Sequence, residues 1–353
     1  MKEKKNLKTI KKKVSQTEAK NGSPVVNEMY CWNKLTAFAA LSVIFGWYFW
    51  RPYALQGTWL RINSSPASAT FGSMSPSSSD KPVRTTFKVI QFNVDHGGES
   101  RLDSILAWLL QQDADVVGFC EANKWQHNLS SIASSAGYEY SEIFPTNHGF
   151  PLAVFAKAPI EVLGKHEEHY ERGVLHVRVL GVHFFVAHLN AHSSATRELE
   201  TLHLASLVLP LSSSLLPVVV MGDMNTLSPL NNMELQNTTI ENRPLLEALS
   251  SLWCYRAMRR KFLNEQDEFA YKPMLHLFAG GLVDASTIHQ PTEPTNIPCD
   301  QAGQCQCPQL RLDYMLVSNQ SAASWKARAN VMIDSVTEEL SDHFPLQLII
   351  EIQ

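Results

Sequence analysis

The pattern over residues 87–120 constrains the fold of this chain more than any other feature. The run FKVIQFNV predicts one buried strand, and the run DVVGFC predicts a second. Between them, apolar side chains recur at the spacing of a helix, at Leu102, Ile105, Leu106, Leu109 and Leu110. Strand, helix and strand in this order predict a βαβ unit, so we expect an α/β fold with a parallel or mixed sheet.

The rest of the chain continues this alternation. Further strands are predicted at residues 152–157, 174–180, 182–189, 216–222, 311–318 and 345–352. Helices are predicted at residues 252–263 and at residues 194–209, where Leu199, Leu202 and Leu209 repeat at helical spacing. The chain is 44% apolar, enough for a sizeable core, and neither a repeat nor a linker interrupts residues 86–353. We therefore expect one α/β domain over residues 86–353.

Polar side chains follow three of these strands in matched pairs. The pairs, each with i, i+2 spacing, are Asn93 with Asp95, His188 with Asn190, and Asp223 with Asn225. In an extended chain, residues two apart point to the same side, so both members of a pair face one direction. The turn preferences of Asp and Asn explain one such pair but do not require three.

Other chemically active side chains adjoin the remaining strands. They are Glu121, Asp313, Asp342 and His343. Because ligands of open α/β sheets bind beyond the carboxyl ends of the strands, we expect these residues and the three pairs to build one site. Carboxylate and amide oxygens without thiolates favour Mg²⁺, with Mn²⁺ as an alternative, and a histidine backed by a carboxylate suits phosphoester hydrolysis.

Each of these residues also has a plainer interpretation. His188 could be a hydrogen-bonded core histidine, and Asp342 with His343 could cap a turn. Glu121 is harder to explain in this way, because a carboxylate at the end of a buried strand needs a partner or a metal ion.

Taken together, these motifs resemble the endonuclease/exonuclease/phosphatase (DNase I-like) superfamily. That superfamily includes DNase I, abasic-site endonucleases, neutral sphingomyelinases and inositol polyphosphate 5-phosphatases. The resemblance covers residues 86–353, with five separated motifs in the order of the family. It implies a four-layered α/β sandwich of two mixed β-sheets flanked by helices, with the active site at the top of the two sheets.

The resemblance also implies a role for each motif residue. The implied ligands or near-ligands of a divalent metal are Asn93, Asp95, Glu121 and Asp342. The implied catalytic residues are His188, Asp223, Asn225, Asp313 and His343. The implied contacts to the substrate phosphate are His188, Asn190 and Asn225. Asp223 would orient or deprotonate the attacking water, and Asp313 would hydrogen-bond His343, which acts as a base or as a transition-state stabiliser.

Three features depart from the family pattern. Cys120 precedes Glu121 where glutamine is usual, and Phe150 stands where DNA-processing members tend to have a phosphate-contacting tyrosine. A Cys-rich insert before RLDYML matches no subgroup. The second departure weakens the interpretation as a DNA-processing enzyme.

A membrane anchor is predicted upstream of the domain. Residues 35–50, LTAFAALSVIFGWYFW, carry no charge and predict one transmembrane helix, although sixteen residues are short for a bilayer. The Lys-rich residues 1–34 would stay in the cytosol by the positive-inside rule, and the Ser- and Pro-rich residues 51–85 would form a stalk. This predicts a single-pass type II protein with a luminal (endoplasmic reticulum or Golgi) or extracellular domain. A cleaved signal peptide and a buried soluble helix are the alternatives.

Two further features fit a luminal domain. Four N-glycosylation sequons follow the predicted anchor, at Asn63, Asn128, Asn237 and Asn319. The motif CDQAGQCQC holds Cys299, Cys305 and Cys307. In an oxidising lumen we expect a local disulfide from Cys299, and the sequence does not say which of the other two cysteines is its partner. A zinc site in this motif is the alternative, but a fourth ligand at normal spacing is missing.

The charge distribution bears on the substrate. Residues 1–51 hold ten of the 30 Lys and Arg and three of the 34 Asp and Glu, which leaves the remainder at about −11. Because nucleic-acid affinity comes largely from neutralising phosphates, an acidic body is poorly suited to DNA. We expect an Mg²⁺-dependent phosphoesterase that acts on a lipid head group or a small phosphorylated molecule. A luminal or secreted-side nuclease and a catalytically silent binding protein are the alternatives, and the oligomeric state stays open.

Overall fold

The computed structural model describes residues 86–214, 216–230, 255–266, 268–286, 290–292, 310–319 and 325–352. These residues belong to one compact unit, Ser79–Gln353. The predicted tail, anchor and stalk lie outside the described residues, as do Asn63, Asn237, Cys299, Cys305 and Cys307. Within the described ranges, no helix combines the length and the apolar character needed to cross a bilayer.

The described residues form two mixed sheets of six strands each. The first sheet has the order β11-β12-β1-β2-β4-β3. Its strands are β1 (Thr86–Asn93), β2 (Val116–Cys120), β3 (Tyr140–Phe144), β4 (Leu152–Ala156), β11 (Trp325–Val331) and β12 (Leu346–Ile352). The second sheet has the order β5-β6-β7-β8-β10-β9. Its strands are β5 (Glu161–His166), β6 (Val174–Val179), β7 (Val182–His188), β8 (Val218–Asp223), β9 (Leu282–Asp284) and β10 (Asp313–Ser318).

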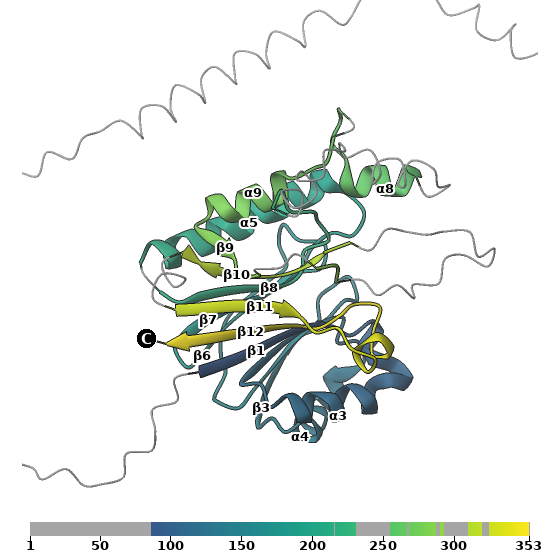
Figure 1. Cartoon of the computed structure of the whole chain (residues 1–353), viewed down its shortest axis with the longest axis vertical. Helices are drawn as coiled ribbons and strands as arrows, with labels where there is room; N and C mark the ends of the chain where they lie inside the picture. The colour runs from purple at the N-terminus through teal and green to yellow at the C-terminus, as the bar shows by residue number, and fades with distance from the viewer. Residues whose placement is uncertain are drawn as a thin grey trace, which may run out of the picture. The chain divides into compact units, whose positions relative to one another are not determined.

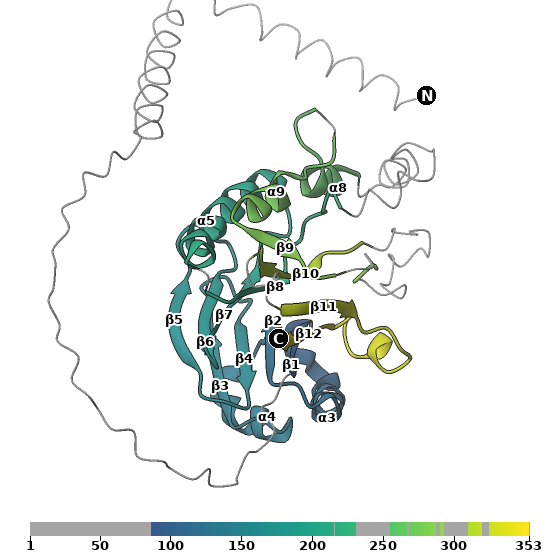
Figure 2. The ribbon, with the colours of Figure 1, turned by 60° about the vertical axis from the view of Figure 1, so that its left-hand side comes forward.

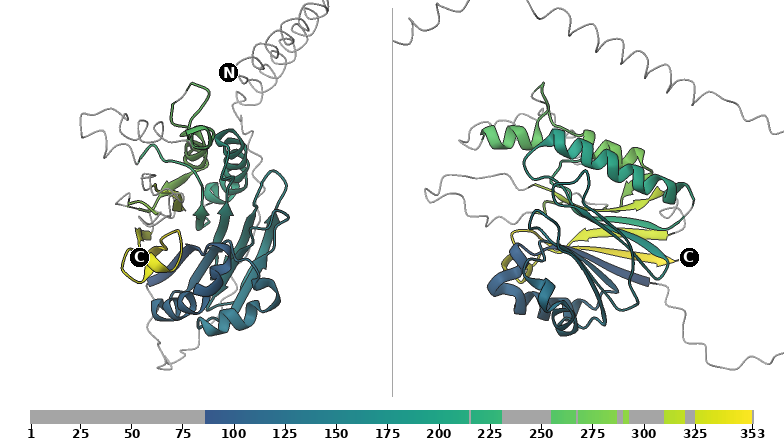
Figure 3. Two further views of the ribbon diagram at one scale, coloured as in Figure 1. Left: turned by 90° about the vertical axis from the view of Figure 1, so that its right-hand side faces the viewer. Right: turned by 180° about the vertical axis from the view of Figure 1, so that it is seen from behind.

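Helices cover the outer face of each sheet, which gives four layers (Figure 1). The helices are α3 (Leu102–Gln112), α4 (Leu129–Ser135), α5 (Ser194–Ser213), α8 (Tyr255–Phe262) and α9 (Lys272–Ala279). Figure 3 shows the blue helices α3 and α4 on one side of the stacked sheets and the teal and green helices on the other. The predicted α/β fold of two mixed sheets flanked by helices is therefore confirmed.

The two-residue period of the strands divides apolar side chains among the layers. On β1, Val89 packs into the core between the sheets, whereas its neighbour Ile90 packs into the core under α3 with Ile105 and Leu109. On β8, Val219 likewise faces the other sheet. Each sheet therefore buries both faces, as expected for a sheet between two layers.

The helix predicted at residues 194–209 is confirmed as α5, but the leucines that indicated it lie on its exposed side. Leu199 and Leu202 are 67% and 53% exposed, and Leu209 is 48% exposed. The face toward the sheet instead carries the buried polar pair Arg197 and Glu200. The Glu200 carboxylate accepts backbone N–H groups of Glu171 and Asn190, and Arg197 donates to the Asn190 carbonyl. Near its N-terminus, the inner face of α5 therefore binds the backbone of neighbouring loops. The spacing of apolar residues cannot predict such polar contacts.

Gly222, next to the end of β8, is required by the close approach of β7. Its φ is 145°, and a Cβ added there would lie 1.9 Å from the Ala187 carbonyl oxygen. We expect Gly222→Ala to reduce the free energy of unfolding by about 2–3 kcal/mol, because the backbone of β7 cannot yield as a side chain would. Denaturant unfolding of the full chain measures this change.

Gly149 offers the matched control, because its φ is 77° but no atom lies within 4 Å of an added Cβ. Gly149→Ala should cost only the backbone strain, about 1 kcal/mol. Equal losses in the two variants would contradict the steric explanation.

Candidate active site

The site lies where the two parallel strand pairs end. Asn93 ends β1 and Glu121 directly follows β2, while His188 and Asp223 end β7 and β8 and are paired in the register. The Asn93 Nδ2 lies 3.3 Å from Asp223 Oδ2 and 3.4 Å from Glu121 Oε1. One amide thus connects the polar ends of the two sheets.

Asp223 is the buried carboxylate at the centre of this arrangement. It is 2% exposed, and its Oδ2 lies 3.4 Å from His188 Nε2 and 3.9 Å from His343 Nε2. Burial alone raises the pKa of the Asp223 carboxyl, but the hydrogen bond from His188 and the charge of His343 outweigh burial and hold the pKa well below its usual range. Asp223 is therefore an anion at neutral pH, surrounded by hydrogen-bond donors.

His343 is held by a fully buried carboxylate. Its Nδ1 lies 2.6 Å from Asp313 Oδ2, and the Gln91 amide donates to Asp313 Oδ1 at 3.1 Å. Burial lowers the pKa of His343, but the Asp313 and Asp223 carboxylates raise it further, so that it ends well above its usual value. The imidazolium is therefore favoured at neutral pH, with Nε2 on the side of Asp223.

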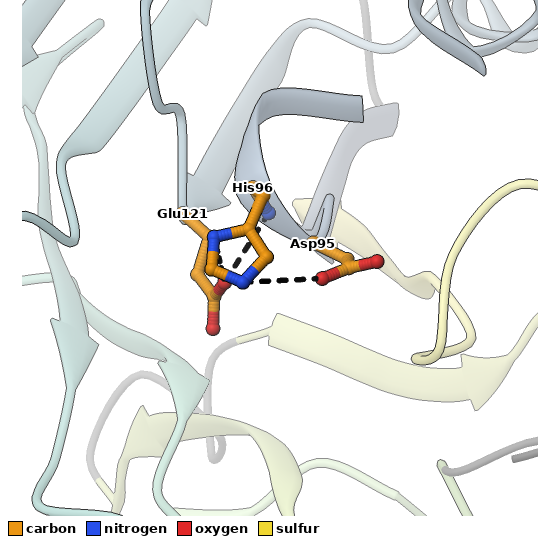
Figure 4. A group of neighbouring side chains, drawn as sticks. All are labelled: Asp95, His96 and Glu121. Atoms are coloured by element: carbon orange, nitrogen blue, oxygen red, sulfur yellow. Dashed lines mark hydrogen bonds and ion pairs between the residues drawn. The ribbon is translucent and has the colours of Figure 1, made fainter. Parts of the chain in front are cut away.

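Asp95, His96 and Glu121 form a candidate metal group beside this centre (Figure 4). Their ligand atoms all lie within 4.8 Å of one another, and the His96 backbone N–H donates to Glu121 Oε2 at 3.2 Å. All three residues have positive φ, at 48°, 53° and 62°, a region that residues other than glycine rarely adopt. Two carboxylates and an imidazole fit a divalent cation, and strained backbone is common at such sites.

Arg172 brings a buried positive charge to the same place from the connection between β5 and β6. Its Nη1 contacts His188 Nε2 and lies 3.7 Å from Glu121 Oε1. Its guanidinium stacks on the Phe150 ring, 3.8 Å from the centroid. Arg172 is 7% exposed, and its Nε has no hydrogen-bond partner among the described residues. A buried donor of this kind fits an anionic ligand.

Three predicted residues take more peripheral positions. Asn190 is buried, and its Oδ1 accepts backbone N–H groups of His192 and Ser193 before α5. Asn225 donates from Nδ2 to the Leu189 carbonyl at 3.2 Å and from its backbone N–H to Asp223. Both amides thus shape the loops around Asp223. Asp342 is exposed, and its Oδ1 accepts from Ser341; its role as a metal ligand stays a prediction.

Sequence reasoning missed three members of the site. His96 directly follows Asp95 in NVDHGG, so its place beside the predicted ligands was a signal that could have been used. Gln91 faces Asp313 across the two sheets, a contact between residues 222 positions apart. Arg172 lies in a polar connection with no periodic pattern, so nothing local indicates its approach to His188.

Comparisons with known proteins identify the family and the fold. A model of the Endonuclease/Exonuclease/phosphatase family matches residues 90–343. The fold is similar to an AP endonuclease from Archaeoglobus fulgidus, with a TM-score of 0.54, 16% identity and coverage of 75% of this chain and 100% of that one. An endonuclease/exonuclease/phosphatase family protein from Bacteroides thetaiotaomicron has a TM-score of 0.47, 16% identity and coverage of 76% and 98%. A search of curated proteins finds no match.

Proposed function

Because the chain belongs to the endonuclease/exonuclease/phosphatase family, we propose that it is an Mg²⁺-dependent phosphoesterase whose active site is centred on Asp223. The observation that carries the proposal is the position of Asp223, an anion at neutral pH between His188 and His343. Hydrolysis of a phosphoester by in-line attack requires a positioned water and positive charge around the phosphoryl oxygens. Asp223 can position such a water, and His343 and Arg172 carry the positive charge.

Asp223 and Asn93 hold the attacking water in this proposal. Asp223 Oδ2 accepts a hydrogen bond from the water. This orients the water so that a lone pair of the water oxygen points at phosphorus. The low pKa of Asp223 makes it a weak proton acceptor, so its main contribution is the orientation of the water. Asn93 Nδ2, 3.3 Å from the same oxygen, fixes the carboxylate.

Two positively charged side chains, His343 and Arg172, neutralise the phosphoryl group in this proposal, and His188 lies between Arg172 and Asp223. His343 donates from Nε2 as an imidazolium, with Asp313 fixing the ring through Nδ1. Arg172 donates from Nη1 to His188 Nε2, and its Nε, which has no hydrogen-bond partner among the described residues, is left for a substrate oxygen. These donors stabilise the negative charge that increases on the phosphoryl oxygens in the transition state.

Glu121, Asp95 and His96 would hold the Mg²⁺ ion, with Mn²⁺ as an alternative because one ligand is an imidazole. When bound, the ion polarises the phosphoryl oxygens and stabilises the leaving oxygen. Asp95 is held toward the group by Arg101, 2.8 Å from its Oδ2. Asn93 and Asp342 remain proposed near-ligands.

The metal group gives a direct prediction for Glu121. We expect Glu121→Gln to raise the Mg²⁺ concentration needed for half-maximal activity by about 10²-fold, because an anionic ligand is lost while the side-chain volume is kept. Glu99→Gln is the control, since the Glu99 side chain is 59% exposed on the same loop and pairs with Lys124. An Mg²⁺ titration of Glu121→Gln that matches the wild type would remove Glu121 from the metal site.

The substrate we propose is a lipid head group or a small phosphorylated molecule. A charge of about −11 outside residues 1–51 disfavours a polyanion, and the side chain that stacks with Arg172 is Phe150, which cannot donate a hydrogen bond to a second phosphate. A predicted anchor at residues 35–50 with a stalk at residues 51–85 would keep the domain close to a membrane. We propose a type II orientation with a luminal or extracellular domain, for which protease protection of microsomes is the test.

A substrate panel tests the proposed function. The full chain in Mg²⁺ is offered phospholipid and sphingolipid vesicles, soluble sugar and inositol phosphates, and plasmid DNA, with Asp223→Asn as the inactive control. Release of phosphate or a phosphorylated head group, lost in Asp223→Asn and with EDTA, is the expected result. Salt-sensitive DNA cleavage without head-group release would establish the nuclease alternative. Inactivity on every class would favour the silent binding protein.

A further inference from the structure

Three histidines gather at the free edge of the second sheet, away from the active site. They lie on adjacent strands, with His166 on β5, His176 on β6 and His183 on β7. Figure 2 shows these strands side by side at the outer edge of the sheet. His176 is paired in the register with Phe185, and residues two apart share a face, so His176 and His183 point to the same side.

The side chains are arranged as a close pair with a third ring beside it. His176 Nε2 lies 3.0 Å from His183 Nδ1, and the His176 ring stacks on Phe185 with centroids 3.9 Å apart. The His166 ring centroid is 6.4 Å from that of His176, with the planes 24° apart. The His166 Nε2 is buried and has no hydrogen-bond partner among the described residues.

Gly164 explains how the third ring reaches this position. It is paired with His176 across β5 and β6, next to an irregularity in the register at Val162. A Cβ at Gly164 would lie 2.4 Å from His166 Nε2. The His166 ring therefore lies back over Gly164 toward His176, in space that any larger residue at 164 would fill.

We propose that His166, His176 and His183 bind a transition-metal ion of the Zn²⁺ class through three imidazole nitrogens. Two nitrogen ligands about 2.0–2.1 Å from a tetrahedral Zn²⁺ are roughly 3.3–3.4 Å apart, so the His176 and His183 pair must open by only a few tenths of an ångström. Among the described residues, only Asp95, His96 and Glu121 have ligand atoms all within 4.8 Å, so the His166 ring must swing inward when the ion binds. Its unpartnered Nε2 favours that movement.

The protonation of the cluster supports the same conclusion. Burial lowers the pKa of His176 to about 4, aided by His183 and His166. Burial also lowers the pKa of His166 and of His183. The three rings are therefore neutral at pH 7, the form in which imidazole binds a metal.

This site is separate from the proposed catalytic metal group. His183 and His188 are five residues apart on β7, about 16 Å along the strand, and an odd separation places them on opposite faces. Val186, on the same face as His188, packs between the sheets, whereas Phe185, on the face of His183, packs with α5. The inference goes beyond the proposed phosphoesterase and stands without it.

Calorimetric titration of the full chain with Zn²⁺ tests the proposal, with Glu121→Gln as the background to remove the catalytic group. We expect a bound ion whose affinity falls by at least about 10²-fold in His176→Asn and in His166→Asn, and is unchanged in His127→Asn, an exposed histidine. Zn²⁺ should also raise the melting temperature by about 5 °C at saturating concentration in the background, and not in the His176 variant.

Two further measurements distinguish loss of this site from unfolding and from binding by thiolates. Circular dichroism checks folding, and His166, on the edge strand β5, supplies the variant to use if His176→Asn unfolds. Co²⁺ in place of Zn²⁺ should give visible absorption of a tetrahedral site without the near-ultraviolet thiolate band that the cysteines at 299, 305 and 307 would add. Zn²⁺ affinity that is unaffected by the histidine substitutions, or the absence of bound Zn²⁺ in the background, overturns the proposal.

Discussion

Asp223→Asn is expected to reduce turnover by about 10³-fold or more while the protein stays folded. The substitution removes the anion that directs the water but keeps a side-chain oxygen that can accept the Asn225 backbone N–H, now 2.9 Å from Asp223 Oδ1. It also leaves the buried His343 imidazolium without one of its two carboxylate partners, so the free energy of unfolding should fall. Initial rates on a chromogenic phosphodiester in saturating Mg²⁺, beside a denaturant melt, measure both quantities.

The control for this prediction is Asp103→Asn, an exposed carboxylate on α3. Its rate should match the wild type. The double variant Asp223→Asn, His343→Gln should be little slower than the slower single variant, because residues that act on one transition state are not additive. A wild-type rate in Asp223→Asn, or full additivity in the double variant, would remove Asp223 from the centre of the site.

Much of the fold could be predicted because strands buried on both faces leave continuous apolar runs. The runs that became β2, β4 and β8 have this character. Edge strands do not. β5 (EVLGKH) and β11 (WKARANV) mix charged and apolar residues, since one side of each strand faces solvent. Strands of this kind are defined by their neighbours, so their own sequence does not identify them.

The helices also show features that depend on tertiary contacts and not on local sequence. The apolar spacing of Leu199, Leu202 and Leu209 predicted α5, yet these leucines are exposed, and Glu200 and Arg197 bind loop backbone on the buried side. Helix α9 begins with Pro273 at its first turn, in a region whose pattern is mixed. Tertiary contacts, which a single sequence does not display, decided both cases.

The candidate site divides in a similar way. Residues at the ends of strands could be identified, because the period of two and the parallel pairing place Asn93, Glu121, His188 and Asp223 at one edge. Arg172 and Gln91 reach the site across long sequence separations, so their contributions depend on how the two sheets stack. The same stacking decides the charge state of His343, through Asp313.

Asp313→Asn is expected to lower turnover at pH 8 by about 10²–10³-fold and to move the basic limb of the pH profile to lower pH. Burial lowers the pKa of His343, but Asp313 and Asp223 raise it well above the ordinary value of about 6.5. If the imidazolium is the active form, the rate falls as pH rises through this raised pKa. Removal of Asp313 lowers the pKa of His343, so the fall begins earlier; rates from pH 5 to 9 measure it.

The free energy of unfolding should also depend on pH through the raised pKa of His343. A group whose pKa is raised on folding stabilises the protein fully below its unfolded pKa, about 6.5, and this contribution is lost as pH rises through the folded pKa. Asp313→Asn should therefore destabilise the protein more at pH 6 than at pH 9, whereas Asp103→Asn, at an exposed carboxylate on α3, should leave this pH dependence of stability unchanged. If His343 acts instead as a neutral base, Asp313→Asn would move the acidic limb to lower pH and raise the rate below pH 6. That profile would assign His343 to proton abstraction in place of transition-state stabilisation.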